Sequence, residues 1–203
     1  SIVIVNADIE DPRVAKSVKM FTDAMPAPLK SSLFYIDMAP ATFTHFAFPS
    51  LGMTHIGSRM CAGIGFHEVA HLHTASLESQ GKDIIQEWTA IQNGSDGNKE
   101  WKGQDFWFSK LGHHEGIEYS DLGFVSTYAM SSADEDISET TGWIFEQTER
   151  VREGVKKNTI LRQKVEFLKK YGYIREDQYD YLTGKIKEPP PRLPTYCDGM
   201  DTL

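Results

Sequence analysis

Hydrophobic positions in the first sixty residues follow two different periods. Apolar residues between positions 11 and 25 recur at helical spacing behind an Asp-Pro pair, which is typical of a helix start. The stretches 33–38 and 42–48 are rich in aromatic and β-branched side chains and predict strands, and residues 2–5 predict a shorter one. Residues 52–57 lie between glycines and fit either a strand at the edge of a sheet or an ordinary loop.

Beyond about residue 58 the apolar spacing is mainly helical. Helices are predicted over 58–77, from Asp83 through residue 91, from Asp134 as the cap through residue 146, over 158–170 and over 174–182. Residues 93–104 predict a polar loop, and the long segment that follows has no clear period, as is common in binding loops. We therefore predict one α+β domain over residues 1–188, with a small mixed sheet and a mainly helical C-terminal half. An extended Pro-rich tail follows at residues 189–203.

Composition and charge narrow the function classes. The chain has 203 residues, 40% of them hydrophobic, and its net charge of −8 argues against the basic surface that nucleic-acid binding needs. No apolar run approaches the roughly 18 residues of a membrane-spanning helix. The sequence begins at Ser1, which is compatible with a trimmed chain or with a mature product whose signal peptide was removed. Cys61 is expected to be a small buried residue, and a Cys61–Cys197 disulfide is the less favoured alternative.

The most informative chemical pattern is His-Glu-Val-Ala-His at residues 67–71. His67 and His71 lie one turn apart on the same face of a helix, so both imidazoles can reach one metal ion. Glu68 is turned aside by one residue, where its carboxylate can accept a proton from a water activated by that metal. Small or apolar residues flank the pattern, as expected of a buried helix. The alternative is a core helix whose histidines only form hydrogen bonds.

A catalytic zinc takes three protein ligands and keeps one position open, so a third ligand has to come from elsewhere in the chain. The metzincin pattern is excluded, because it requires a glycine and a histidine at the positions of Thr74 and Leu77. His73 faces nearly the opposite side of the helix from His71, so we do not expect it to be a ligand.

Glu135 and Glu139 are the leading candidates to complete the site. They stand four residues apart on one predicted helix face, so one carboxylate can bind zinc while the other holds a ligand histidine by its second ring nitrogen. Acidic residues at a helix start also favour the helix dipole without binding any metal. His113 or His114 is the alternative third ligand.

One stretch of the chain resembles the C-terminal motif of gluzincin metallopeptidases. Residues 123–139 read Gly-Phe-Val-Ser-Thr-Tyr-Ala-Met-Ser-Ser-Ala-Asp-Glu-Asp-Ile-Ser-Glu. They are especially similar to the zinc-binding metallopeptidases found as bacterial envelope lipoproteins. The likeness is more distant to the anthrax lethal factor catalytic domain and the Pro-Pro endopeptidases. The resemblance covers roughly residues 60–75 and 120–172.

This resemblance implies a zincin-like fold and assigns roles to three residues. The family shares a tyrosine followed, seven residues later, by a Glu-x-x-x-Glu helix. That pattern implies Glu135 as the zinc ligand, Glu139 as the partner of a ligand histidine and Tyr128 as the donor to the oxyanion. The chain departs from the usual Glu-Asp-Phe-Ala-Glu at Ile137 and Ser138, which are packing positions.

The motif and the resemblance together predict a zinc endopeptidase that binds one zinc ion per chain and acts on a protein or peptide. One alternative is a binding module of the bacterial envelope that has lost catalysis. Another is an aminopeptidase, in which Glu115 or Glu118 would anchor the substrate amine. The expected location is secreted or in the cell envelope, with or without a lipid anchor. Delivery into a host cell as an effector is the alternative.

Overall fold

Helices dominate the part of the chain that the computed structural model describes, which comprises residues 3–5, 19–37, 46–48, 53–55, 62–94, 101 and 122–191. The helical elements are α2 (Ala27–Ser31), α3 (Ala62–Ser79), α4 (Ile84–Asn93), the 3-10 turn η2 (Tyr128–Met130), α6 (Ala133–Glu146), α7 (Thr148–Lys157), α8 (Thr159–Lys170) and α9 (Glu176–Leu182). Residues 19–24 are helical as well. Within these described ranges, no helix is both long enough and apolar enough to cross a membrane.

The strands are four short segments: β1 (Val3–Val5), β2 (Tyr35–Asp37), β3 (Phe46–Phe48) and β4 (Met53–His55). They pair in the order β1-β2-β4-β3, with β3 antiparallel to β4 and the other pairs parallel. The predicted α+β class is wrong, because the described chain is mostly helical and each strand has only three residues. A three-residue strand offers too few alternating side chains to form a layer, so helices pack mainly on helices.

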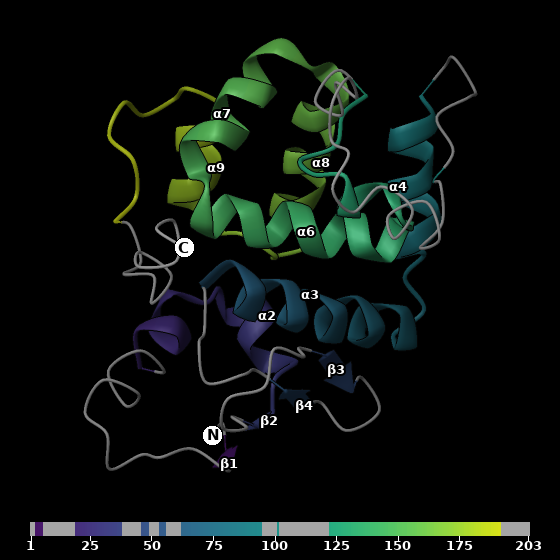
Figure 1. The fold of residues 1–203 in the computed structure, drawn as a ribbon, viewed down its shortest axis with the longest axis vertical. Helices are drawn as coiled ribbons and strands as arrows, with labels where there is room; N and C mark the ends of the chain where they lie inside the picture. Colours follow the sequence, from purple (N-terminus) through teal and green to yellow (C-terminus); the bar gives the residue numbers. More distant parts are fainter. Residues whose placement is uncertain are drawn as a thin grey trace, which may run out of the picture.

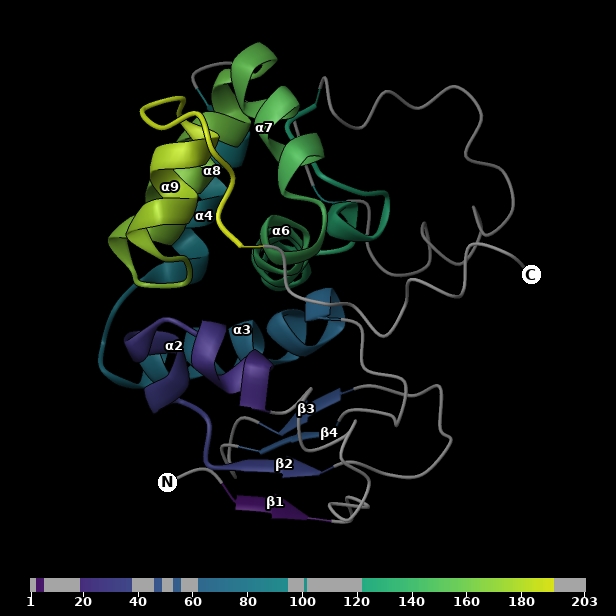
Figure 2. The ribbon, with the colours of Figure 1, turned by 90° about the vertical axis from the view of Figure 1, so that its left-hand side faces the viewer.

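The elements stack along the long axis of the molecule (Figures 1 and 2). The strands lie at one end, and α2 and α3 lie between them and the rest. Helix α6 crosses the middle on top of α3, and α4, α7, α8 and α9 form the opposite end. The chain therefore places α3 and α6, which are separated by more than fifty residues in the sequence, against each other at its centre.

The contact between α3 and α6 is unusually close because glycines lie where the two helices cross. A Cβ atom added to Gly142 of α6 would meet the carbonyl oxygen of Gly63 of α3 at 2.5 Å. Beside this crossing, the rings of Phe66 and Phe145 stack with centroids 3.4 Å apart. Ile137 and Ile144 of α6 are fully buried. This packing fixes α6 relative to the His67–His71 pair.

The ends of two predicted helices can be compared with these bounds. Helix α8 begins and ends as predicted, and the Asn158 side chain caps it by accepting a hydrogen bond from the Leu161 amide at 3.0 Å. Helix α6 is capped by Ser132 rather than by Asp134, since the Ser132 hydroxyl accepts from the Glu135 amide. Helices α2 and α7 were not predicted.

Several sequence predictions fall outside the described residues. They are the helix start at residues 11–18, Cys61, Cys197, most of the polar loop at 93–104, the irregular segment that follows it and the tail beyond residue 191. The extent of the domain likewise remains a prediction.

Candidate metal centre

Three side chains from α3 and α6 converge on one point. His67 and His71 lie one turn apart on α3, and their Nε2 atoms are 3.1 Å apart. The Oε2 atom of Glu135, from α6, lies 3.2 Å from the Nε2 of His67 and 3.5 Å from that of His71. All three atoms belong to a group that could hold a metal ion.

The donor set and its spacing fit zinc. Imidazole nitrogen and carboxylate oxygen are usual zinc ligands, and tetrahedral ligands about 2.0–2.1 Å from zinc lie roughly 3.3 Å from one another. The three separations found here are 3.1, 3.2 and 3.5 Å. The Oε2 atom of Glu135 is buried and, despite its short contacts, accepts no hydrogen bond. A cation between the three atoms would satisfy it.

A carboxylate from α6 holds the outer nitrogen of each histidine. The Nδ1 of His67 donates to Glu139 Oε1 at 3.1 Å, and the Nδ1 of His71 donates to Asp134 Oδ2 at 2.8 Å. The second oxygen of Glu139 accepts from the Ser126 hydroxyl at 2.6 Å. Because each Nδ1 carries the proton, each Nε2 can present its lone pair to a metal.

The charges around the imidazoles raise their pKa values. Burial lowers the pKa of His67, but contacts with Glu135 and Glu139 outweigh burial and raise it to about 9. Burial likewise lowers the pKa of His71, and contacts with Asp134 and Glu135 raise it to about 10. Burial raises the pKa of Glu135, yet attraction to the two histidines holds it well below its usual value. A metal ion that binds here therefore displaces protons from the histidines.

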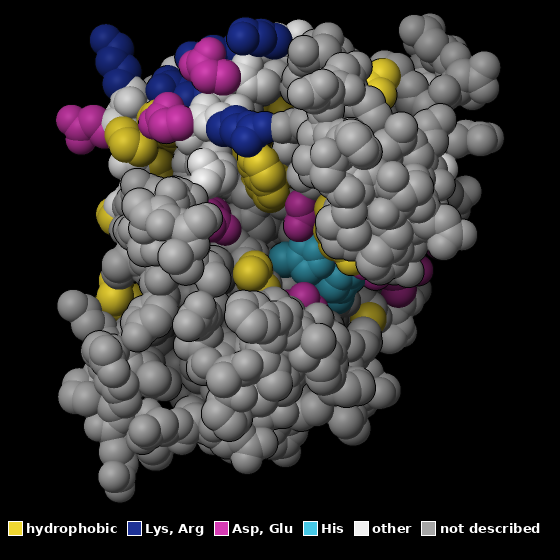
Figure 3. Space-filling model, in the orientation of Figure 1, with side chains coloured by type: hydrophobic (Ala, Val, Ile, Leu, Met, Phe, Trp, Pro, Cys, Tyr) yellow, Lys and Arg dark blue, Asp and Glu magenta, His cyan; other side chains and the backbone are white. Residues whose placement is uncertain are grey.

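Glu68 and Tyr128 lie beside this cluster. Glu68 follows His67 on α3 and is only 6% exposed, and burial raises the pKa of its carboxyl group. Tyr128 is in η2, and its ring lies 6.0 Å from that of His67 at an angle of 24°. Burial, followed by the charge of Glu135, raises the pKa of Tyr128, so its hydroxyl keeps the proton it could donate. Figure 3 shows histidine side chains on this face of the molecule, with acidic side chains next to them.

Comparisons with known proteins bear on the fold. No family model matches the chain, and no curated protein matches it. Among solved structures, it is similar to the crystal structure of a protein from Bacteroides caccae whose assignment as a zinc-binding metallo-peptidase is itself provisional. The two sequences are 18% identical, and the match covers 85% of this chain and 73% of the other, with a TM-score of 0.53. The chain has a metallopeptidase-like fold. At this level of identity the match shows the fold alone.

His73, the next histidine on α3, points away from the cluster of His67, His71 and Glu135. Its Nε2 donates to the Tyr171 carbonyl oxygen at 2.9 Å, and its Nδ1 accepts from the Ser32 hydroxyl at the same distance. His113 and His114, like Glu115 and Glu118, lie outside the described residues.

Two contacts of the cluster escaped the sequence analysis. Asp134 was expected only as a helix cap, yet it accepts a hydrogen bond from His71. Ser126 was not singled out at all, yet its hydroxyl donates to Glu139. The position of Asp134, immediately before the predicted ligand Glu135, was the available signal. Ser126 carried no signal, because its contact with Glu139 depends on how the chain folds back before α6.

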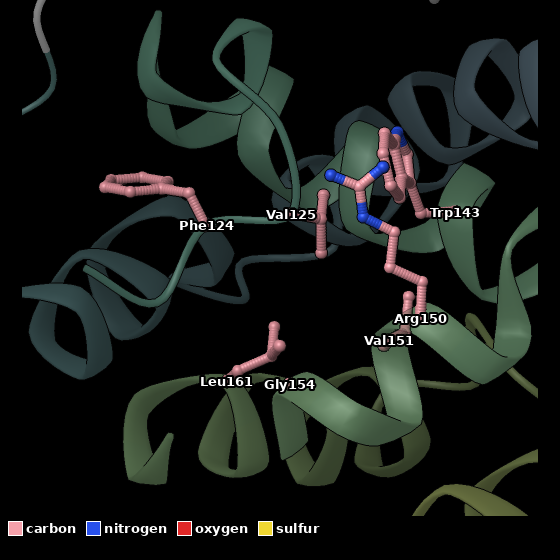
Figure 4. Close-up of a pocket in the computed structure, with 7 residues that line it drawn as sticks. All are labelled: Phe124, Val125, Trp143, Arg150, Val151, Gly154 and Leu161. Atoms are coloured by element: carbon pink, nitrogen blue, oxygen red, sulfur yellow. The ribbon is translucent and has the colours of Figure 1, made fainter. Parts of the chain in front are cut away.

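A small cavity lies among helices α6, α7 and α8 and the segment before η2 (Figure 4). It measures about 30 Å³ and lies among Phe124, Val125, Trp143, Arg150, Val151, Gly154 and Leu161. The guanidinium group of Arg150 lies 4.6 Å from the centre of the Trp143 ring. The lining is otherwise apolar, so this cavity offers space for packing rather than a second reactive site.

Proposed function

We propose that this protein is a zinc-dependent endopeptidase. The observation that carries the proposal is the convergence of His67, His71 and Glu135 at separations typical of tetrahedral zinc, with the buried Glu68 carboxylate beside them. The structural likeness to a protein provisionally named as a zinc-binding metallo-peptidase supports the same assignment.

In this proposal His67, His71 and Glu135 hold one zinc ion, and Glu139 and Asp134 orient the two imidazoles. Zinc, when bound, polarises a peptide carbonyl and lowers the pKa of a water molecule towards about 7. With three protein ligands, a bound zinc would keep one position for water or substrate, as catalytic zinc sites do.

Glu68 and Tyr128 carry the proton and charge transfers. Glu68 accepts the proton of the attacking water and passes it to the amine that leaves when the peptide C–N bond breaks. Burial raises the pKa of Glu68 and makes both transfers easier near neutral pH. Tyr128 donates a hydrogen bond to the carbonyl oxygen as negative charge develops on it.

The test is cleavage of a diverse peptide pool, read by mass spectrometry, with the zinc-loaded protein. We expect internal cleavage that a chelator abolishes and added zinc restores. Glu68→Gln is the matched control, because the amide keeps the size of the side chain but cannot accept the water proton. It should keep zinc and the melting temperature while losing nearly all hydrolysis.

Each contrary result points to a different class. A zinc-loaded protein that leaves the pool intact would indicate a binding module. Release of single residues from the N-termini would indicate an aminopeptidase. A folded protein that binds no zinc would refute the catalytic proposal altogether.

A further inference from the structure

A buried ion pair includes Asp136, the residue that follows Glu135 of the candidate metal centre. Asp136 of α6 and Lys164 of α8 are both fully buried, and Lys164 Nζ donates to Asp136 Oδ2 at 2.6 Å. Asp136 follows Glu135, so its side chain leaves the helix about 100° further round. Glu135 therefore reaches α3, whereas Asp136 reaches α4 and α8.

Every oxygen of the Asp136 carboxylate has a donor. Its Oδ2 also accepts from Trp88 Nε1 at 2.8 Å, and its Oδ1 accepts from the Thr140 hydroxyl at 3.4 Å. Lys164 Nζ has a second acceptor in the Gly123 carbonyl oxygen at 2.7 Å, and it lies 4.4 Å from the centre of the Phe124 ring. The pair is thus part of a buried polar network that packs against the hydrophobic core.

Stability alone does not explain such a network. Removing two charges from water is costly, and apolar residues of similar volume in place of a buried ion pair often leave a protein equally stable or more so. What a buried pair does supply is direction, because its hydrogen bonds are satisfied in only one arrangement of the segments that carry it.

The arrangement fixed here is that of the segments around the proposed site. Gly123 begins the segment that leads to Ser126, which bonds Glu139, and then to Tyr128. Gly123 has a φ of +85°, and a Cβ atom there would meet Ile160 at 2.7 Å, so the turn requires glycine. Lys164 therefore joins the start of the Tyr128 segment to the first turns of α6.

We propose that Asp136 and Lys164 are positioning residues that set the affinity of the site for zinc and the turnover of the enzyme, rather than the stability of the fold. They act through Glu135, the next residue along α6, and through the segment that carries Ser126 and Tyr128. This inference rests on the proposed function, since it concerns the same site.

The test uses the double variant Asp136→Leu/Lys164→Met, which removes both charges and leaves neither unpaired. Three quantities are measured: the melting temperature of the metal-free protein, zinc affinity by chelator competition, and kcat and KM on a peptide that the parent cleaves. The variant leaves the buried Trp88 N–H and the Gly123 carbonyl without their partners, so we expect a somewhat lower melting temperature. Zinc binding should weaken 10–100-fold, as when groups that orient ligands are lost. The value of kcat should fall while KM changes little.

The matched control is Val155→Ala in α7, a buried residue that takes no part in the network. It should lower the melting temperature and leave zinc affinity near the parent value. Zinc affinity that simply followed stability in both variants would overturn the proposal. So would a double variant that binds zinc and turns over like the parent.

A further variant covers the case in which the double variant does not fold. Trp88→Phe removes one donor to Asp136 and keeps the ion pair. Weaker zinc binding by this variant supports the proposal, and unchanged zinc binding overturns it. A parent protein that binds no zinc refutes the proposed function and this inference together. If the parent binds zinc and the variants without the network bind it equally well, the inference alone is refuted.

Discussion

Gly142→Ala should weaken metal binding at the proposed zinc site much more than it destabilises the fold. The added Cβ would lie 2.5 Å from the Gly63 carbonyl oxygen and 3.4 Å from the Cβ of His67. The first contact is with helix backbone, which cannot rotate away as a side chain can. Helices α3 and α6 must therefore move apart, and they carry the two halves of the proposed zinc site.

The expected magnitudes differ for stability and for metal binding. Restoring ordinary contact requires a shift of about 1 Å. Overpacking of this kind costs about 1–3 kcal/mol, and alanine regains about 1 kcal/mol of helix propensity, so the protein should still fold. Metal–ligand distances, by contrast, tolerate only about 0.2 Å. A shift several times larger should weaken zinc binding by 10–100-fold or more.

Chelator competition and thermal melting of the metal-free protein measure the two effects. Gly154→Ala is the matched control, because its Cβ would meet only Leu161 Cδ2, at 2.6 Å, and both residues line the small cavity into which that side chain can move (Figure 4). It should keep the zinc affinity of the parent. If Gly142→Ala bound zinc as tightly as the parent, the close crossing of α3 and α6 would not determine the zinc affinity of the site.

Three further predictions concern the site itself. Glu135→Ala should abolish zinc retention, whereas Glu139→Ala should weaken it only 10–100-fold. The reverse ranking in a graded chelator series would mean that Glu139, one helical turn further along, is the zinc ligand. Tyr128→Phe should lower turnover by about 10²–10³-fold. An unchanged kcat would show that Tyr128 does not donate a hydrogen bond to the oxyanion. Elemental analysis should find one zinc per chain, and zinc at about 1,000 times its Kd should stabilise the fold by about 4 kcal/mol, whereas unchanged melting would argue against a specific site.

Local signals predicted the parts of the structure that depend on neighbouring residues. The pattern at residues 67–71 predicted a helix with both histidines on one face, and α3 carries them in that way. Asn158 was recognised as a helix start because its side chain can accept a backbone N–H, a property that needs no tertiary context. The spacing of Glu135 and Glu139 was visible for the same reason.

Tertiary contacts account for what the sequence did not show. Residues in the first half have high strand propensity, but the core forms between helices, so the predicted fold class was wrong. Helix α7 has only Val151 and Val155 buried among charged residues, a pattern too sparse to recognise. Lys164 reads as a surface residue, and only the position of Asp136 explains why it is buried.

The charge balance of the cluster explains how so acidic a helix start packs against α3. Asp134, Glu135 and Glu139 bring three carboxylates to two imidazoles whose pKa values rise to about 9 and about 10. The hydrogen bonds from the two Nδ1 atoms to Glu139 and Asp134 do not involve the metal, so they support the α3–α6 contact with and without zinc. The stacked rings of Phe66 and Phe145 hold the same two helices together. The metal-free protein should therefore stay folded, and its melting can be compared between variants.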